Sequence, residues 1–401
     1  MVGLNNLLKT TSRKALKILK NYNFSYNEQW KYTNIDNYKN FSFTENIIND
    51  LDNNKNFNDN EIIIINNILQ NKNNVYPFIH ITSINDAIKK NLFGCKDIFN
   101  QIIPLDKNHF ILYNTAYFNN GNYLYFEKNH TIENPICINN SIKQKNLTSF
   151  FNNRLLFHFG ENFSGKIILK EKNNHEVLTN IVCEVYLEEN TNVNFIIESE
   201  KHKTTQILNF GSTINKNAIL KIHPIDISGK LIKNNYFINL KGKNSQCYYN
   251  GLNLLNHSNH IDNYIEVNHN NKHTISHTNQ KNILDGKSKG IFYSKATINK
   301  YSANSEAHQK NNNLILSNKS IVHSNPQLMI YNNDVQCSHG SSTGEVDYDA
   351  LFYLRSRGIS IQKAKKMLVH AFIDEIIDTI DDENIKNNIQ DKIYTWIKDV
   401  N

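Results

Sequence analysis

The pattern of hydrophobic and polar positions changes twice along the chain. Up to about residue 108, apolar residues recur at helical spacing, and the run NDAIKKNLFG predicts a short helix ended by Gly94. From Phe110 to Tyr331 the chain contains short β-type runs separated by Asn, Gly or Lys. Examples of these runs are HFILY, NYLYF, GKIILK, IVCEVYL and GIFYSKATI. Beyond Asp347 a helical period returns, so the pattern predicts helices on both sides of a β-rich region.

Polar turns recur at nearly constant spacing in the β-rich region. They begin at Asn192, Asn217, Asn244 and Asn271, with separations of roughly 25 to 27 residues. Such a period is typical of a solenoid, in which each coil pairs in parallel with its neighbours. Asn suits the corners because it tolerates left-handed backbone and its amides can stack in ladders. The alternative is an antiparallel sandwich, which the scarcity of two-residue hairpin signals disfavours.

The C-terminal region predicts two helices joined by a tight turn. Asp347 is a favourable N-cap for the first helix, whose apolar face we expect to contain Leu351, Phe352 and Leu354. Gly358 supplies a left-handed stop, and a loop over 340–344 is expected to open the hairpin.

Ser360 is expected to cap the second helix of this hairpin. Its apolar residues at helical spacing are Ala364, Met367, Leu368, Ala371, Phe372 and Ile376. A DNA-reading helix-turn-helix would have the same outline. However, Asp374, Glu375 and Asp378 on the second helix would repel phosphates.

Composition narrows the class of protein. The net charge of +7 over 401 residues is modest. The sequence has no dense Lys/Arg stripe of the kind that predicts nucleic-acid binding. Five cysteines, far apart and odd in number, indicate neither a disulfide framework nor a zinc finger. The chain shows no apolar stretch long enough to span a membrane and no apolar signal-peptide region near its start. We therefore expect a cytoplasmic protein that binds neither nucleic acid nor membranes.

Two groups of residues resemble ligand sites by type but not by spacing. His257 and His260 are followed by His269, His273 and His277, and on one straight strand four residues would span about 13 Å. One ion could not gather the last three, so we interpret them as surface or ladder histidines.

The second group is the run Gly286–Lys287–Ser288. It lacks the earlier glycine of a phosphate-binding loop and precedes a strand, so nucleotide binding is not predicted there.

The run Cys337–Ser338–His339 is the remaining candidate for chemistry. If it ends a strand, Cys337 and His339 point to the same face, and a thiolate and an imidazole could share an ion. Two ligands do not complete a metal site, so the others would come from elsewhere in the chain, from water or from a partner. A packing cysteine beside a solvent-facing histidine is the alternative.

The same region carries a family resemblance. QLMIYNNDVQCSHGSSTGEVDYDALFYLRSRGIS, followed by AKKMLVHAFIDEII, closely resembles the C-terminal signature of the SufD family, scaffold subunits of the SUF iron–sulfur cluster assembly system. ILDGKSKGIFYSKATI and YNTAYFNNGNYLYFEKNHTIENPICI are similar to its late and first coils, and NEQWKYTNI resembles a segment of its N-terminal helical domain. The related SufB chains carry a cysteine at the position of Leu354, which favours SufD.

The resemblance implies a right-handed parallel β-helix flanked by N-terminal and C-terminal α-helical domains. The expected limits are 1–108 for the N-terminal domain, 109–338 for the β-helix and 339–401 for the C-terminal domain. It also implies a non-catalytic scaffold that pairs with SufB through the end of the β-helix and docks two copies of the SufC ATPase. Sulfur-donor proteins are further expected partners, and a homodimer is expected without SufB.

The resemblance also assigns site residues. His339 matches a histidine implicated at the SufB–SufD interface, and Cys337 is the neighbouring thiol, so both are expected to contact a transient iron ion or iron–sulfur cluster. No cofactor is expected to stay bound to the isolated chain, although reduced flavin is associated with the complex. The expected SufC-binding residues are Asp347, Leu351, Phe352, Tyr353, Arg355, Arg357 and Gly358.

The alternative function is a free-standing β-helix that binds or cleaves polysaccharides. Such proteins are usually exported and often carry acidic clusters along one sheet. Here the acidic residues of the middle region, Asp226, Asp262, Glu266 and Asp285, are dispersed in the sequence.

Overall fold

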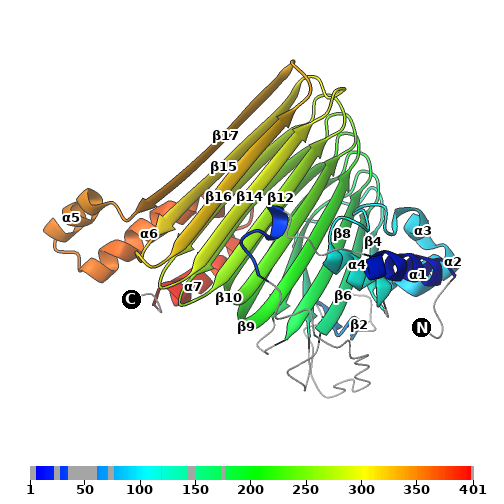
Figure 1. Cartoon of the computed structure of the whole chain (residues 1–401), viewed down its shortest axis with the longest axis horizontal. Coiled ribbons are helices and arrows are strands. Elements are labelled where there is room, and N and C mark those ends of the chain that lie inside the picture. Colours follow the sequence, from blue (N-terminus) through cyan, green and yellow to red (C-terminus); the bar gives the residue numbers. More distant parts are fainter. Residues whose placement is uncertain are drawn as a thin grey trace.

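Most of the chain forms one stack of parallel strands with helices at both ends (Figure 1). The computed structural model describes residues 6–21, 28–34, 61–70, 76–118, 120–142, 150–172 and 177–398. Apart from the pairs β1–β2 and β3–β4, the strands of this region pair in parallel. The predicted parallel solenoid with flanking helices is confirmed, and the antiparallel sandwich is wrong.

The solenoid has two faces, and every coil contributes a strand to each. The first face contains β3 (Ile79–Ser83), β4 (Asn122–Phe126), β6 (Phe150–Phe159), β8 (Leu178–Leu187), β12 (His260–His269), β14 (Lys289–Ile298) and β16 (Ile321–Ile330). The second contains β1 (Glu61–Ile65), β2 (Ile68–Leu69), β5 (Ile136–Ser141), β7 (Ser164–Lys172), β11 (Gln246–Leu255), β13 (Ile275–Leu284), β15 (Ser305–Ile315) and β17 (Val335–Glu345). The long strands β9 (Asn192–Ile214) and β10 (Ile219–Leu240) run through both faces and join them.

Asparagine ladders form one corner of the coils. Asn190, Asn217 and Asn244 all have left-handed backbone, with φ of 58°, 56° and 59°. The Nδ2 of Asn217 donates to Oδ1 of Asn190 at 2.9 Å, and that of Asn244 donates to Oδ1 of Asn217 at 2.9 Å. The predicted ladder is therefore confirmed at two of its four turns. At the other two, the left-handed residue is Asn190 rather than Asn192, and His273 rather than Asn271.

The interior changes from aromatic to polar along the stack. A column of rings from Phe195 through Phe210 and Tyr236 to Tyr249 packs at centroid distances of 5.0 to 5.7 Å. Beyond it the Tyr249 hydroxyl donates to Oε1 of Gln280 at 3.0 Å, and buried amides lie beside apolar residues in the later coils. These amides satisfy one another: Asn253 donates to Asn282 at 2.8 Å, and Asn282 donates to Asn313 at 2.6 Å.

The N-terminal helices cover the first coils. They are α1 (Asn6–Asn21), α2 (Ile84–Lys90), η3 (Leu92–Gly94), α3 (Cys95–Ile98) and α4 (His109–Ala116), whereas the short helix η1 (Glu28–Trp30) opens a segment that reaches the late coils. Arg154 of β6 joins this layer to the solenoid: its guanidinium contacts Glu184 at 2.5 Å and donates to the Thr115 hydroxyl at 3.0 Å. Because Arg154 and Glu184 are both buried, each depends on the other for its charge to be compensated.

Three expectations for the N-terminal part are wrong. HFILY begins α4 rather than a strand, because its apolar residues face both the coils and α1. The run EIIII, in a region expected to be helical, is strand β1, which extends the second face beyond β5. The helix expected to end at Gly94 ends at Lys90, where Asn91 takes the left-handed conformation.

The segment around Trp30 packs on the outer face of the late coils (Figure 1). Thr33 donates to the carboxylate of Asp262 and contacts Nε2 of His260 at 2.9 Å. Tyr32 stacks on His323 of β16 with centroids 4.0 Å apart. This segment, expected in the N-terminal helical domain, therefore spans several coils of the solenoid.

The C-terminal helices are α5 (Tyr348–Ser356), α6 (Ile361–Ile377) and α7 (Glu383–Lys398). The buried residues Val369, Ile373 and Ile376 of α6 pack against outward-facing Leu252 and Ile283. Glu375 of α6 binds Lys281 at 2.7 Å and Lys310 at 2.8 Å, and hydrogen bonds from these lysines lower the pKa of Glu375 to about 2. Among the described helices, none is long and apolar enough to cross a bilayer.

The corner ladder predicts a stability difference between two variants of Asn217. Asn217→Ala keeps a Cβ at the left-handed position but removes both amide bonds, so the free energy of unfolding should fall by about 1–2 kcal/mol. Asn217→Gly removes the same bonds but tolerates the backbone conformation, so it should lose less. Urea unfolding followed by circular dichroism measures both. Equal losses would contradict the role given to the left-handed corner.

Candidate functional site

The last coil leaves the interior of the solenoid open. β16 pairs in parallel with β14, and β17 pairs in parallel with β15. No strand within the described ranges pairs with the other edge of β16 or β17. Every residue of these two strands is at least partly exposed, whereas inward-facing residues of β15 such as Ala307 and Gln309 are buried. We call the edge formed by β16 and β17 the rim.

Cys337 and His339 both face the interior of the solenoid at this rim. In the parallel register Cys337 is opposite Ala307 and His339 is opposite Gln309, and both of those residues are inward-facing. Cys337 is half-buried and packs with Ala296 and Ala307, and burial raises the pKa of its thiol. His339 is exposed, so its imidazole is accessible from the open end.

Two polar contacts that the sequence did not predict link the two faces of the solenoid at the rim. The Ser341 hydroxyl donates to the Ser324 hydroxyl at 2.8 Å, linking β17 to β16. One coil below, Nε2 of Gln309 donates to the carbonyl of Gln327 at 3.1 Å. The coil period offered a signal for them, because it places these side chains on the inward face beside Cys337 and His339.

The predicted pair is thus on one face, as expected for two residues of a strand, but it does not end the strand. β17 continues to Glu345, past the expected domain limit at 338, and the expected loop over 340–344 is extended strand. Glycine is unfavourable within strands, but the pairing with β15 holds this stretch extended, and Gly340 and Gly344 lie in register with Lys310 and Leu314. The domain limits themselves stay a prediction.

The helical hairpin has the predicted ends. The carboxylate of Asp347 accepts from the backbone N–H groups of Asp349 and Ala350, and the Ser360 hydroxyl accepts from that of Lys363. Gly358 has φ of 82°, so it provides the left-handed turn between α5 and α6. Asp347 and Gly358 therefore have clear structural roles.

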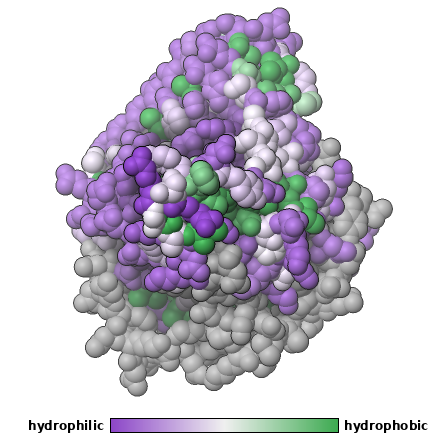
Figure 2. All heavy atoms as spheres, turned by 90° about the vertical axis from the view of Figure 1, so that its left-hand side faces the viewer, coloured by the Kyte–Doolittle hydropathy of each residue, from purple (hydrophilic) through white to green (hydrophobic). Residues whose placement is uncertain are grey.

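The expected partner-binding residues of α5 divide into one buried and several exposed side chains. Leu351 is buried, whereas Phe352 is 75% and Tyr353 is 56% exposed. Phe352 therefore does not belong to the packed apolar face that we predicted. Arg355 is exposed, and Arg357 lies over the Tyr353 ring at 5.2 Å. Figure 2 shows this end of the molecule, where hydrophobic patches interrupt the polar surface.

The second helix buries a different set of residues from the expected one. Ala364 and Ile376 are buried as predicted, whereas Met367 and Ala371 are exposed and Leu368 and Phe372 are half-buried. The buried face of α6 is centred on Val369, Ile373 and Ile377 and contacts the solenoid rather than α5.

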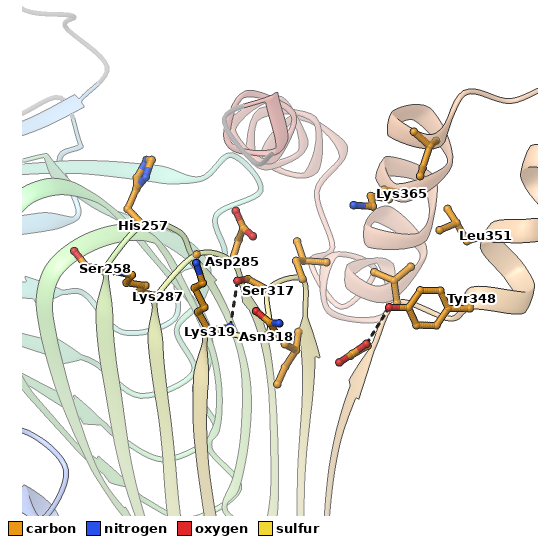
Figure 3. A pocket seen from close by; sticks show the side chains of 16 residues that line it. His257, Ser258, Asp285, Lys287, Ser317, Asn318, Lys319, Tyr348, Leu351 and Lys365 are labelled. Atoms are coloured by element: carbon orange, nitrogen blue, oxygen red, sulfur yellow. Dashed lines mark hydrogen bonds between the residues drawn. The ribbon is translucent and has the colours of Figure 1, made fainter.

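A groove of about 1210 Å³ separates the hairpin from the turns of the late coils (Figure 3). Asp285, Lys287 and Lys319 project into it from the coil turns, and Tyr348 and Lys365 project from the helices. The Tyr348 hydroxyl donates to the Glu345 carboxylate at 3.1 Å. The hairpin therefore contacts the solenoid along α6 but projects from it along α5.

Most of the histidines that resembled a ligand site in the sequence lie at corners of the coils or inside the protein. His257 and His273 have left-handed backbone at corners, and His269 is buried between the hydroxyls of Thr274 and Ser276 at 2.8 Å each. Burial lowers the pKa of His260 to about 4 and that of His269 to about 3, so both are neutral at pH 7. The interpretation of His269, His273 and His277 as surface or ladder histidines holds for His273 and His277, which are exposed, and is wrong for His269, which is buried.

The run Gly286–Lys287–Ser288 forms a turn between strands β13 and β14, so the helix that a phosphate-binding loop needs does not follow it. The strand that the sequence predicted after this run is confirmed.

The fold places the chain in a class of proteins built on a two-faced parallel β-solenoid, here with an open last coil and a projecting helical hairpin. The family model for the SUF system FeS cluster assembly SufBD core domain matches residues 140–372, more than half of the chain. The chain therefore belongs to the SufBD core family of the SUF system.

Curated relatives support the predicted resemblance to SufD. SufD of Escherichia coli (strain K12) is 31% identical over 171 residues, which are 43% of this chain and 40% of that protein. SufD of Bacillus subtilis (strain 168) is 22% identical over 307 residues, which are 74% of this chain and 68% of that protein. A SufBD family protein of Synechocystis is 28% identical over 202 residues, which are 50% of this chain and 45% of that protein. The chain thus spans less than half the length of the E. coli and Synechocystis relatives.

The rim geometry predicts selective labelling of one cysteine. Cys95, Cys137, Cys183 and Cys247 are buried, whereas Cys337 is partly exposed. We expect iodoacetamide to modify Cys337 in the native protein at least about tenfold faster than the other four, because a reagent must reach the thiolate. Mass spectrometry of tryptic peptides measures each site. Comparable labelling of a buried cysteine would contradict the packing, and Cys337→Ser should remove the fast phase.

Proposed function

We propose that this chain is a non-catalytic scaffold of iron–sulfur cluster assembly that pairs through its rim with a SufB-type chain. The observation that carries the proposal is the open last coil, where backbone edges and inward-facing side chains are exposed together. Membership of the SufBD core family and similarity to SufD relatives support it. The scaffold assists iron acquisition and cluster assembly at the shared interface.

The rim suits a related chain because unpaired strand edges bind other strands. β16 and β17 each present a row of backbone groups, which a partner coil could satisfy by continuing the parallel pairing. A second copy of this chain could occupy the same edges when SufB is absent. The polar interior near Gln280 and Asn313 keeps the open end compatible with water before pairing.

At this interface the chain supplies an incomplete ligand set for iron as cargo. His339 offers an accessible imidazole nitrogen, and Cys337 offers a soft sulfur once its proton is removed. Burial raises the pKa of the Cys337 thiol in the isolated chain, and a nearby cation would favour its thiolate. The partner provides the remaining ligands.

The hairpin docks the SufC ATPase in this proposal. Phe352 and Tyr353 are large exposed aromatic side chains on a helix that projects from the solenoid, and such side chains are frequent at protein interfaces. Arg355 and Arg357 can orient the partner through charged hydrogen bonds. Movement of two ATPase subunits would then be transmitted through α6 to the late coils.

The acidic residues argue against the polysaccharide alternative. Asp262 is buried and contacts Lys233 at 2.7 Å, and Glu266 is buried and contacts Lys107 at 2.7 Å. Asp226 is buried and accepts from Asn234 at 2.8 Å. These three carboxylates hold the fold together. Of the four acidic residues, Asp285 alone lines the groove, so they do not form an acidic cluster along one sheet and the family-based proposal is preferred.

The first test replaces His339 in a co-expressed complex with SufB and SufC. His339→Ala should leave co-purification intact but lower bound iron and sulfide severalfold, because one ligand is lost from the shared site. His273→Asn, at an exposed corner, is the matched control and should change neither quantity. Unchanged iron and sulfide in the His339 variant would remove this residue from the mechanism.

The second test addresses the hairpin. Phe352→Asp should reduce co-purification of SufC by about tenfold or more, because it places a charge in a desolvated contact. Tyr301→Asp is the control, since Tyr301 is 73% exposed in a turn at the opposite corner of the coils. Circular dichroism shows whether both variants fold. Full retention of SufC by the Phe352 variant would refute docking through α5.

A further inference from the structure

Three metal-binding side chains gather on the outer face of the late coils. His277 on β13 and Glu306 and His308 on β15 offer ligand atoms that all lie within 4.8 Å of one another. In the parallel register His277 is directly opposite His308, and Glu306 precedes His308 by two residues on the same face. Backbone pairing therefore holds the three groups together.

Neighbouring side chains orient both imidazoles. Nδ1 of His308 lies 2.7 Å from the Ser338 hydroxyl of β17. When that hydroxyl accepts from Nδ1–H, the Nε2 atom keeps its lone pair for an ion. On the other side the Tyr248 ring lies 5.4 Å from the His277 ring, and the two histidine rings are 5.1 Å apart.

The local charges suit a cation. Burial and the neighbouring His308 lower the pKa of His277. Glu306 supplies a negative charge. The next lysine on this face, Lys310, binds Glu375 of α6 at 2.8 Å and so is directed away from the cluster.

We propose that His277, Glu306 and His308 bind one divalent transition-metal ion, with the remaining coordination positions open to water. Two imidazoles and one carboxylate form the ligand set of Zn²⁺ and Fe²⁺ sites that keep an open position, whereas Mg²⁺ prefers oxygen ligands.

This site is separate from the rim pair. Cys337 and His339 face the interior, whereas Ser338 faces outward beside His308. An ion bound by the cluster would link β13 to β15 directly and reach β17 through Ser338. The site therefore lies outside the proposed SufB interface but ties together the three strands of the second face nearest to it.

The test titrates the full chain with ZnCl₂ by calorimetry and with CoCl₂ by visible absorption, using MgCl₂ as the hard-cation comparison. We expect the wild type to bind one equivalent of Zn²⁺. The double variant His277→Gln/His308→Gln should weaken the affinity for this ion by about tenfold or more, and Glu306→Gln should weaken it less. Zn²⁺ should also raise the melting temperature of the wild type but not that of the double variant. MgCl₂ should do neither.

Two matched variants locate the ion. His273→Asn changes an exposed histidine four residues from His277 and should retain binding. Cys337→Ala/His339→Ala removes the rim pair and should also retain this equivalent. Undiminished affinity and thermal shift in the double glutamine variant, or their loss in the rim variant alone, would overturn the proposal.

Discussion

Parallel backbone hydrogen bonding from coil to coil determines where every other feature of this protein lies. Because the register is maintained from β11 to β17, a residue of one coil has a fixed neighbour in the next. The same pairing aligns the corner asparagines, the aromatic column and the interior amides. It also creates the rim, since a stack of paired strands must end in strands whose outer edges are unpaired. The rim is thus a consequence of the architecture, and its side chains give it chemical character.

Much of the fold could be predicted because a solenoid repeats local rules. Asn217 and Asn244 marked the corners through a preference that belongs to single residues, and Asp347, Gly358 and Ser360 marked helix ends for the same reason. The predictions were wrong where tertiary contacts determine the secondary structure. HFILY has strand-like composition but forms α4, because it is covered by α1 on one side and the coils on the other.

For the candidate sites as well, the sequence revealed residues that are close in sequence and missed those that only the fold brings together. The pair Cys337 and His339 was recognised because its two residues are close in sequence. His277 and His308 were not paired, because 31 residues separate them and only the coil length brings them together. His277 was instead grouped with His269, which lies on β12 before the corner turn, and with His273, which lies in that turn. Placing each histidine on the repeat, rather than comparing it with its sequence neighbours, would have revealed the cluster.

The segment Trp30–Thr33 constrains how the molecule can be made. Thr33 contacts Asp262, and the carbonyl of Tyr32 accepts from Lys289 at 2.9 Å, so these contacts bridge 229 and 257 positions of the chain. During synthesis this segment leaves the ribosome long before its docking surface exists. Contacts of such long sequence separation form slowly. Attachment of the segment Trp30–Thr33 is therefore a late folding event, and until it occurs the outer side of β12, β14 and β16 lacks these contacts.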